Sequence, residues 1–149
     1  MKEFQDVVNK GSRHLLIVEV DGTYERTSLY FKEADIPFNF GLISKVKRDG
    51  KTLAQGVRDT VTEYLKAVPE GKTPNWVIGN HDVDRVGSRV GVGADNRNPM
   101  NVLLLTLPGV VTTYYGEEIG MLNGNIVKYD PRDKERTPMQ WSAEANAGG

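Results

Sequence analysis

Three residues with side chains suited to chemistry stand together in the middle of the chain: Asn80, His81 and Asp82. They follow directly after the apolar run at 76–79, which predicts a short buried strand. An amide, an imidazole and a carboxylate are therefore expected side by side at the carboxyl end of that strand. In a β/α fold, this end of a strand is where an active site is built.

Two other apolar runs end in carboxylates in the same way. The run at 15–18 leads into Glu19, and the run at 110–115 leads through a glycine into Glu117 and Glu118. When several parallel strands each release a polar residue at the same end, the usual architecture is a β/α barrel with its active site on that face. Such a site would suit a polyhydroxylated substrate.

Carboxylates delivered by neighbouring strands could cleave a glycosidic bond. That reaction needs one carboxylic acid to protonate the leaving oxygen and one carboxylate to meet the oxocarbenium-like centre. We interpret Glu19 and Asp82 as candidates for this work, because strand ends hold side chains more rigidly than loops do. Glu19 follows an apolar run, so partial desolvation is expected to favour its protonated form, as a general acid requires. The alternative is that Glu19 is an ordinary charge where a strand meets water.

Other chemistries fit these residues less well. The His81-Asp82 pair also suggests a metal-dependent phosphohydrolase, but such sites need further ligands, and His14 is the one other histidine. Cysteine is absent from the sequence, which removes thiolate catalysis and Cys-based zinc sites. Asp84 is interpreted as a charge in a solvated turn. No metal site is predicted.

Two glutamates and several arginines surround these candidates in the sequence. Glu117 and Glu118 are adjacent, so on an extended segment they face opposite ways and at most one could touch a substrate. The alternative to substrate binding is that these two glutamates cap the strand or pair with arginine. Guanidinium groups that could hold a carboxylate or vicinal sugar hydroxyls occur at Arg85, Arg89, Arg132 and Arg136.

Length and composition limit the possible architectures and partners. The 149 residues are 38% hydrophobic and 26% charged, as in an ordinary globular sequence. A complete β/α barrel needs roughly 250 residues, so we expect about half a barrel, and therefore a fragment. The formal net charge of −1 comes without a basic stripe, and nucleic acid is not an expected partner. No run approaches the roughly 20 apolar residues of a membrane helix, and residues 1–10 are too polar for a secretory signal.

Helices and strands are expected to alternate along the chain. A short helix ending near Gly11 precedes a continuous, buried apolar strand at 15–20. A polar stretch at 21–35 then leads to a second, shorter strand at 36–40, whose early proline is compatible with a strand start.

The clearest predicted helix spans 52–68, where apolar residues recur at helical spacing until Pro69 and Gly71 end it. A strand at 75–79 and a long loop at 83–99 follow it.

Near the end of the chain one more helix and one more strand are expected. Asn98 and Pro99 predict the cap and first turn of a helix that ends near Pro108. The last strand is expected at 110–115. After Gly120 the sequence becomes polar and turn-prone, as expected of a segment that lies over a barrel rim.

Five segments, taken together and in this order, resemble the α-amylase superfamily, glycoside hydrolase family 13. The resemblance is to its maltase and α-glucosidase branch, and it is closest to insect-type maltases. The segments are LLIVEVDGT around Glu19, IPFNFGLIS from Ile36, NWVIGNHDVDRVGSR from Asn75, LLLTLPGVVTTYYGEEIGM from Leu103, and RDKERTPMQW from Arg132.

The resemblance implies an α/β fold: the C-terminal half of a (β/α)8 TIM barrel, incomplete, covering roughly strands 5 to 8. Residues 1–120 would form that half of the catalytic barrel. Residues 121–149 would form a rim segment leading toward the end of the barrel and a C-terminal β-domain.

The resemblance also implies roles for individual residues. Glu19 matches the family's acid/base, and Asp82 matches the carboxylate that stabilises the transition state. His81 matches a residue that hydrogen-bonds the sugar, and Arg136 resembles an arginine that helps to hold the terminal glucose. Arg85 resembles a residue that lines the site beside Asp82.

One departure from the family pattern bears on activity. The family's nucleophile is an aspartate in a Gly-Phe-Arg-Ile-Asp-like segment, and no such segment precedes residues 1–12. The isolated chain is therefore predicted to be inactive. The full-length parent is expected to be a retaining α-glucosidase that takes small α-glucosides such as maltose, sucrose or short oligosaccharides.

Further properties of the parent follow from the resemblance alone. No cofactor is expected, and any calcium site of the family lies outside these residues. The parent is expected to be extracellular or membrane-anchored. No oligomeric state is predicted.

Two alternatives stay open. The first is a non-catalytic homologue, such as the extracellular domain of an amino-acid transporter heavy chain, although the intact Asn80, His81, Asp82 and Glu19 count against it. The second is a sibling activity on related sugars, such as sucrose isomerisation, trehalose hydrolysis or transglucosylation.

Overall fold

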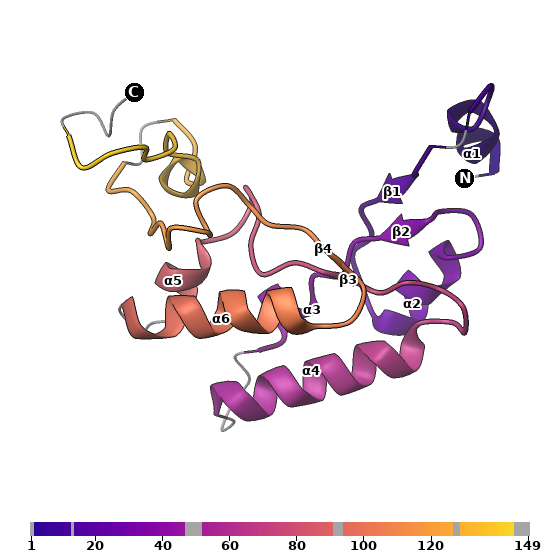
Figure 1. Cartoon of the computed structure of the whole chain (residues 1–149), viewed down its shortest axis with the longest axis horizontal. Coiled ribbons are helices and arrows are strands. Elements are labelled where there is room, and N and C mark those ends of the chain that lie inside the picture. The colour runs from indigo at the N-terminus through magenta and orange to yellow at the C-terminus, as the bar shows by residue number, and fades with distance from the viewer. Residues whose placement is uncertain (1, 13, 47–51, 91–93, 127–128, 145–149) are drawn as a thin grey trace. The chain divides into compact units, whose positions relative to one another are not determined.

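The described part of the chain combines short parallel strands with helices (Figure 1). The computed structural model describes residues 2–12, 14–46, 52–90, 94–126 and 129–144.

Contacts divide the chain into two compact units. The first comprises residues 1–76 and 108–111, and the second comprises residues 77–107 and 112–149. The predicted barrel boundary near residue 120 stays a prediction.

Among the described residues, all strand pairing lies within the first unit and is parallel. Strand β1 (Ile17–Val18) pairs with β2 (Ile36–Pro37), and β3 (Asn75–Trp76) pairs with β4 (Val110–Val111). Parallel pairs need a crossover connection, which the helices between them provide. The four strands confirm the predicted positions, although each is shorter than the apolar run that contains it.

The prediction of a buried first strand is wrong. Leu15 is 61% exposed and Ile17 is 46% exposed. In the part of the chain that the structure describes, β1 pairs with β2 alone, whereas a buried parallel strand is covered on both faces. Strand β3 behaves as predicted, since Trp76 is completely buried.

Helix α4 (Leu53–Ala67) confirms the clearest sequence prediction. Its amino end is closed by a capping box, in which the Thr52 hydroxyl accepts the Gln55 N–H and the Gln55 side chain accepts the Thr52 N–H. This arrangement satisfies two backbone donors that a helix start leaves without partners.

Helix α4 fixes β3, the strand that precedes the candidate site. The Tyr64 hydroxyl accepts the Asn75 N–H at 3.2 Å, and the Tyr64 ring meets the Trp76 ring edge-on, with centroids 5.1 Å apart. The Trp76 indole donates to the Pro108 carbonyl at 2.7 Å. A buried indole with a partner anchors a strand in one position.

Two helices of the first unit lie where no helix is predicted. Helix α2 (Tyr24–Tyr30) occupies the polar stretch at 21–35, and α3 (Gly41–Ser44) follows β2. Thr23 caps α2 by accepting the Arg26 N–H. Helix α1 (Lys2–Val8) agrees with its prediction.

The second unit contains three helical segments: α5 (Val86–Arg89), α6 (Ala94–Thr106) and the 3-10 helix η1 (Asp133–Glu135). The predicted start of the last helix at Asn98 and Pro99 is wrong, because α6 begins at Ala94 and contains Pro99. Because Pro99 lies beyond the first turn of α6 and has no N–H, the helix lacks one backbone hydrogen bond there.

Arg89 closes the loop that carries the candidate site. One of its guanidinium nitrogens donates to the Ile78 carbonyl, and the other donates to the Asp84 carbonyl at 2.6 Å. These two carbonyls stand on either side of the segment 79–83. The side chain therefore ties the two ends of that segment together.

Glu117 lies buried beneath the start of the same segment. Its side chain accepts the Tyr114 N–H at 2.9 Å, and the residue is 2% exposed. A Cβ placed on Gly79 would lie 2.5 Å from the Glu117 Oε1, so a larger residue there would require the Glu117 carboxylate to move. Burial raises the pKa of Glu117 to about 7, although the Tyr114 N–H and Arg89 act in the opposite direction. Glu117 thus caps the turn after β4. This is the structural role that the sequence left open as the alternative to substrate binding.

No helix in the described ranges combines the length and the apolar character needed to cross a bilayer.

The raised pKa of Glu117 predicts a pH-dependent effect of Glu117→Gln. An unfolded glutamate loses its proton near 4.5, whereas the folded one keeps it up to about 7. The wild-type chain should therefore lose stability between these pH values, while the glutamine variant has no proton to lose. The advantage of Glu117→Gln over wild type should grow by on the order of 2 kcal/mol from pH 5 to pH 8.

Urea unfolding at the two pH values measures this difference. Glu63→Gln is the control, because it removes an exposed carboxylate from α4, far along the chain from Glu117, and it should give no comparable gain in stability between the two pH values. An advantage of Glu117→Gln that stays constant or shrinks as the pH rises would contradict the prediction.

Candidate functional site

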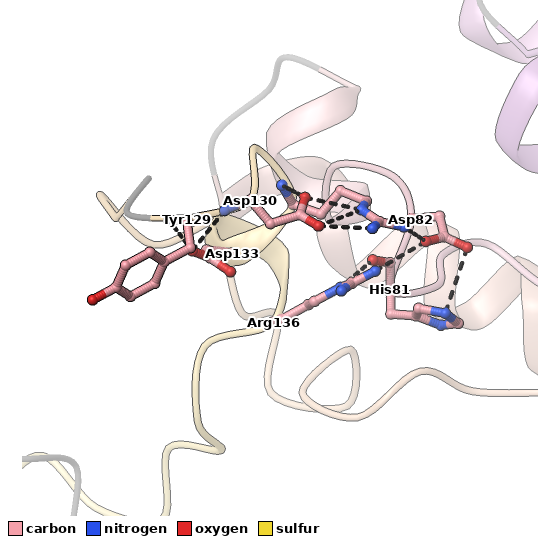
Figure 2. A network of polar contacts seen from close by, with 7 residues as sticks. His81, Asp82, Tyr129, Asp130, Asp133 and Arg136 are labelled. Carbon is pink, nitrogen blue, oxygen red and sulfur yellow. Dashed lines mark hydrogen bonds and ion pairs between the residues drawn. The ribbon is translucent and has the colours of Figure 1, made fainter.

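Asp82 is the centre of a network of charged side chains on the surface of the second unit. Its Oδ1 accepts from the Arg132 Nη1 at 2.7 Å and from the Arg136 Nη2 at 3.0 Å. Its Oδ2 lies 3.5 Å from the His81 Nε2. Figure 2 shows the side chains of His81 and Arg136 beside Asp82. Both carboxylate oxygens therefore have partners, and the group is still exposed to solvent.

The backbone around Asp82 is fixed locally. The Asn80 side-chain oxygen accepts the Asp82 N–H at 2.9 Å, which forms an Asx-type turn. The Arg136 Nε donates to the His81 carbonyl at 2.7 Å. Arg136 consequently holds both the main chain of this turn and the carboxylate that the turn presents.

Arg132 and Arg136 stand on either side of η1 and approach Asp82 from that segment. A second ion pair ties the segment to the loop, because the Lys134 Nζ lies 2.5 Å from the Asp84 Oδ1. The hydrogen bond from Lys134 lowers the pKa of Asp84. The Asp84 side chain is 41% exposed, which agrees with its interpretation as a solvated charge, and its carboxylate also binds Lys134 and Asn123.

The electrostatics of the network keep Asp82 ionised. The hydrogen bond from Arg132 is the main reason that the pKa of Asp82 lies below its ordinary value, and His81 and Arg136 act in the same direction. The carboxylates of Asp130 and Asp82 raise the pKa of Arg132 above its usual range. An exposed, permanently charged carboxylate can stabilise a positive centre, and it is a poor proton donor.

Asp130 is a partner of the site that sequence reasoning missed. It contacts Arg132 through three donors: Nε at 2.9 Å, Nη2 at 2.7 Å and the backbone N–H at 2.8 Å. Arg132 lowers the pKa of Asp130 strongly. The only sequence signal is the Asp-Pro-Arg spacing, since an aspartate readily accepts the N–H of the residue two positions later.

Arg85 lies in the interior of the second unit, at 1% exposure. Its Nη1 donates to the Tyr115 carbonyl at 2.7 Å, and its guanidinium lies 5.0 and 4.6 Å from the ring centroids of Tyr114 and Tyr115. Among the described contacts of Arg85, none reaches Asp82. The side chain braces the turn after β4, and its role in lining the site stays a prediction.

Glu19 follows β1 in the first unit and is exposed. The expected partial desolvation of Glu19 is therefore wrong here, because within the described ranges β1 has a strand neighbour on one side only. The structure brings together His81, Asp82 and Arg136 from the predicted set. The meeting of Glu19 with Asp82 stays a prediction.

Metal ligands do not gather in this region. Over the residues that the structure describes, no three or more His, Asp or Glu side chains are grouped so that they could hold a metal ion.

Comparison with known proteins places the chain in a family. The model of the α-amylase catalytic domain matches residues 1–149. An α-glucosidase of Culex pipiens is 39% identical over 147 residues, which cover 93% of this chain and 25% of that protein. The human amino acid transporter heavy chain SLC3A1 is 43% identical over 136 residues, which cover 83% of this chain and 19% of that protein.

Solved structures agree with the sequence comparison. The α-amylase from H. orenii superposes with a TM-score of 0.75 at 27% identity, covering 95% of this chain and 29% of that one. This likeness confirms the predicted fold class, a partial TIM barrel. The chain spans about a quarter of the length of the curated relatives it matches. The match to the family model over residues 1–149 and the 39% identity to the mosquito enzyme establish that this chain belongs to the α-amylase family, as part of its catalytic domain.

Proposed function

We propose that this chain supplies part of the active site of a retaining α-glucosidase. The whole protein would hydrolyse the terminal α-glucosidic bonds of maltose, sucrose or short oligosaccharides. The observation that carries the proposal is the state of Asp82: exposed, ionised and held beside His81 by two guanidinium groups. This is the group that an oxocarbenium-like transition state requires.

Each residue has a defined part in this reaction. Glu19 protonates the leaving oxygen and then serves as base for the attacking water. The fixed negative charge of Asp82 stabilises the positive charge that develops on the sugar ring. His81 and Arg136 hydrogen-bond the hydroxyls of the terminal glucose, and Arg85 supports the wall of the site from within. Carboxylates alone can carry this chemistry, so the proposal needs no cofactor.

The covalent intermediate forms on a carboxylate that this chain does not provide. The printed 149 residues contain no Gly-Phe-Arg-Ile-Asp-like segment. In the proposal, the nucleophile belongs to another part of the whole protein. By the same resemblance, we propose an extracellular or membrane-anchored location.

The first prediction concerns Asp82→Asn in the whole protein. The variant should stay folded and lose about 10²-fold in kcat on maltose, because it removes the fixed charge that meets the transition state. Glu63→Gln, which removes an exposed carboxylate from α4, is the control and should have wild-type activity. With an aryl α-glucoside as substrate, whose other product is a phenol, NMR of the glucose first released should show the α anomer, as retention requires. An unchanged kcat in Asp82→Asn, or release of the β anomer, would refute the assignment.

The second prediction concerns the 149-residue chain by itself. Without a nucleophile it should release no glucose from maltose, even at high concentration over many hours. The assay is glucose release by the purified chain, with Asp82→Asn of the same chain as the blank. Turnover that follows the chain through gel filtration and disappears in Asp82→Asn would overturn the prediction of inactivity.

A second candidate function has its own support. The likeness to the amino acid transporter heavy chain SLC3A1 is as strong as that to the α-glucosidases. In this alternative the domain is non-catalytic and serves as the extracellular part of a transporter. Assays of the whole protein on maltose, sucrose, isomaltose and trehalose distinguish the two. Hydrolysis supports the glucosidase, whereas inactivity together with a co-purifying membrane subunit supports the transporter partner. Isomerised products would indicate a sibling activity.

A further inference from the structure

Arg132 is the residue whose orientation decides how Asp82 is held. Its side chain is partly exposed, at 46%, as is that of Asp82, at 38%. A long exposed arginine ordinarily samples many rotamers, because its side chain has several rotatable bonds. Here the guanidinium makes a single short hydrogen bond to Asp82, so something else must fix its plane.

Asp130 provides that constraint. One carboxylate oxygen accepts from the Arg132 Nε at 2.9 Å, and the other accepts from Nη2 at 2.7 Å. This is the bidentate arrangement in which a planar guanidinium is held most firmly. The Arg132 backbone N–H also donates to Asp130, at 2.8 Å. Both ends of the arginine are thus fixed, and Nη1 donates to the Asp82 Oδ1.

We propose that Asp130 is a positioning residue for the reaction: by clamping Arg132, it fixes the carboxylate of Asp82 in the orientation that meets the sugar ring. The proposal rests on the proposed function, since it concerns the same site. Asp130 has no contact with the reacting atoms in this account and acts only through Arg132.

The two effects that Asp130 can have on Asp82 differ in sign. As a mere neighbouring negative charge, Asp130 disfavours ionisation of Asp82, so its removal would lower the pKa of Asp82. As a clamp, it supplies Asp82 with a hydrogen bond from Arg132, so its removal would raise that pKa. His81 and Arg136 also face Asp82, and they are unchanged in both cases.

A mutant cycle on the 149-residue chain measures which effect dominates. The side-chain carboxyl of Asp82 is followed by ¹³C NMR against pH in wild type, Asp130→Asn, Arg132→Gln and the double variant. The wild-type pKa should lie below the ordinary 3.8. Arg132→Gln should raise it, because the hydrogen bond that lowers it is lost, and Asp130→Asn should also raise it. In the Arg132→Gln background, Asp130→Asn should cause no further rise.

Two results would overturn the proposal: a fall in the pKa of Asp82 on Asp130→Asn, or a rise of the same size whether or not Arg132 is present. Asp130→Glu, which keeps the bidentate acceptor, should restore most of the wild-type value. Its failure to do so would also count against a clamp.

The same four variants in the whole protein give a second readout, the acid limb of kcat/KM on maltose. Asp130→Asn should shift that limb toward higher pH, and only when Arg132 is present. The outcomes separate the two claims. If NMR shows that the effects of Asp130 and Arg132 on Asp82 are coupled but the whole protein hydrolyses nothing, the clamp is supported and the proposed function is refuted. Hydrolysis with no coupling would do the reverse.

Discussion

The arrangement of the site depends on one oxygen atom, Oδ1 of Asp82, which accepts from two guanidinium groups. Arg132 and Arg136 come from the η1 segment, some fifty residues further along the chain. These ion pairs join the loop that follows β3 to the 3-10 helix η1. The two guanidinium groups favour the ionised form of Asp82. A protonated Asp82 would be neutral and could not stabilise a cationic sugar ring.

Beneath this surface network lies a buried one that shapes the same loop. Arg89 bridges the carbonyls at the two ends of the segment 79–83, and Glu117 lies against Gly79. Burying such groups costs free energy that hydrogen bonds must offset. The raised pKa of Glu117 is the sign of that cost. The loop that carries the candidate site is therefore held by buried hydrogen bonds of Arg89 and Glu117 and by the exposed arginines that bind Asp82.

Local signals in the sequence were enough for part of this fold. The apolar spacing of α4 and the Pro69 and Gly71 that follow it predict this helix well, and the apolar run that contains Trp76 correctly predicts a strand before Asp82. Exposure of β1 could not be predicted, because burial depends on neighbours that a local pattern does not contain. The residue types near Asp82 indicated arginine partners. The sequence could not show which arginines reach Asp82. It also could not show that Arg85 packs against the tyrosines instead, because both outcomes depend on contacts between segments that are distant in the sequence.

The account's central claim is that Asp82, ionised and oriented, meets one glucose ring together with Glu19. A crystal structure of the whole protein with bound glucose tests it most directly. We expect the carboxyl groups of both residues to lie within hydrogen-bonding or van der Waals distance of the same ring, with the pair of Arg132 and Asp130 intact. A glucose that touches neither carboxylate, or carboxylates too far apart for one ring to reach both, would contradict the account.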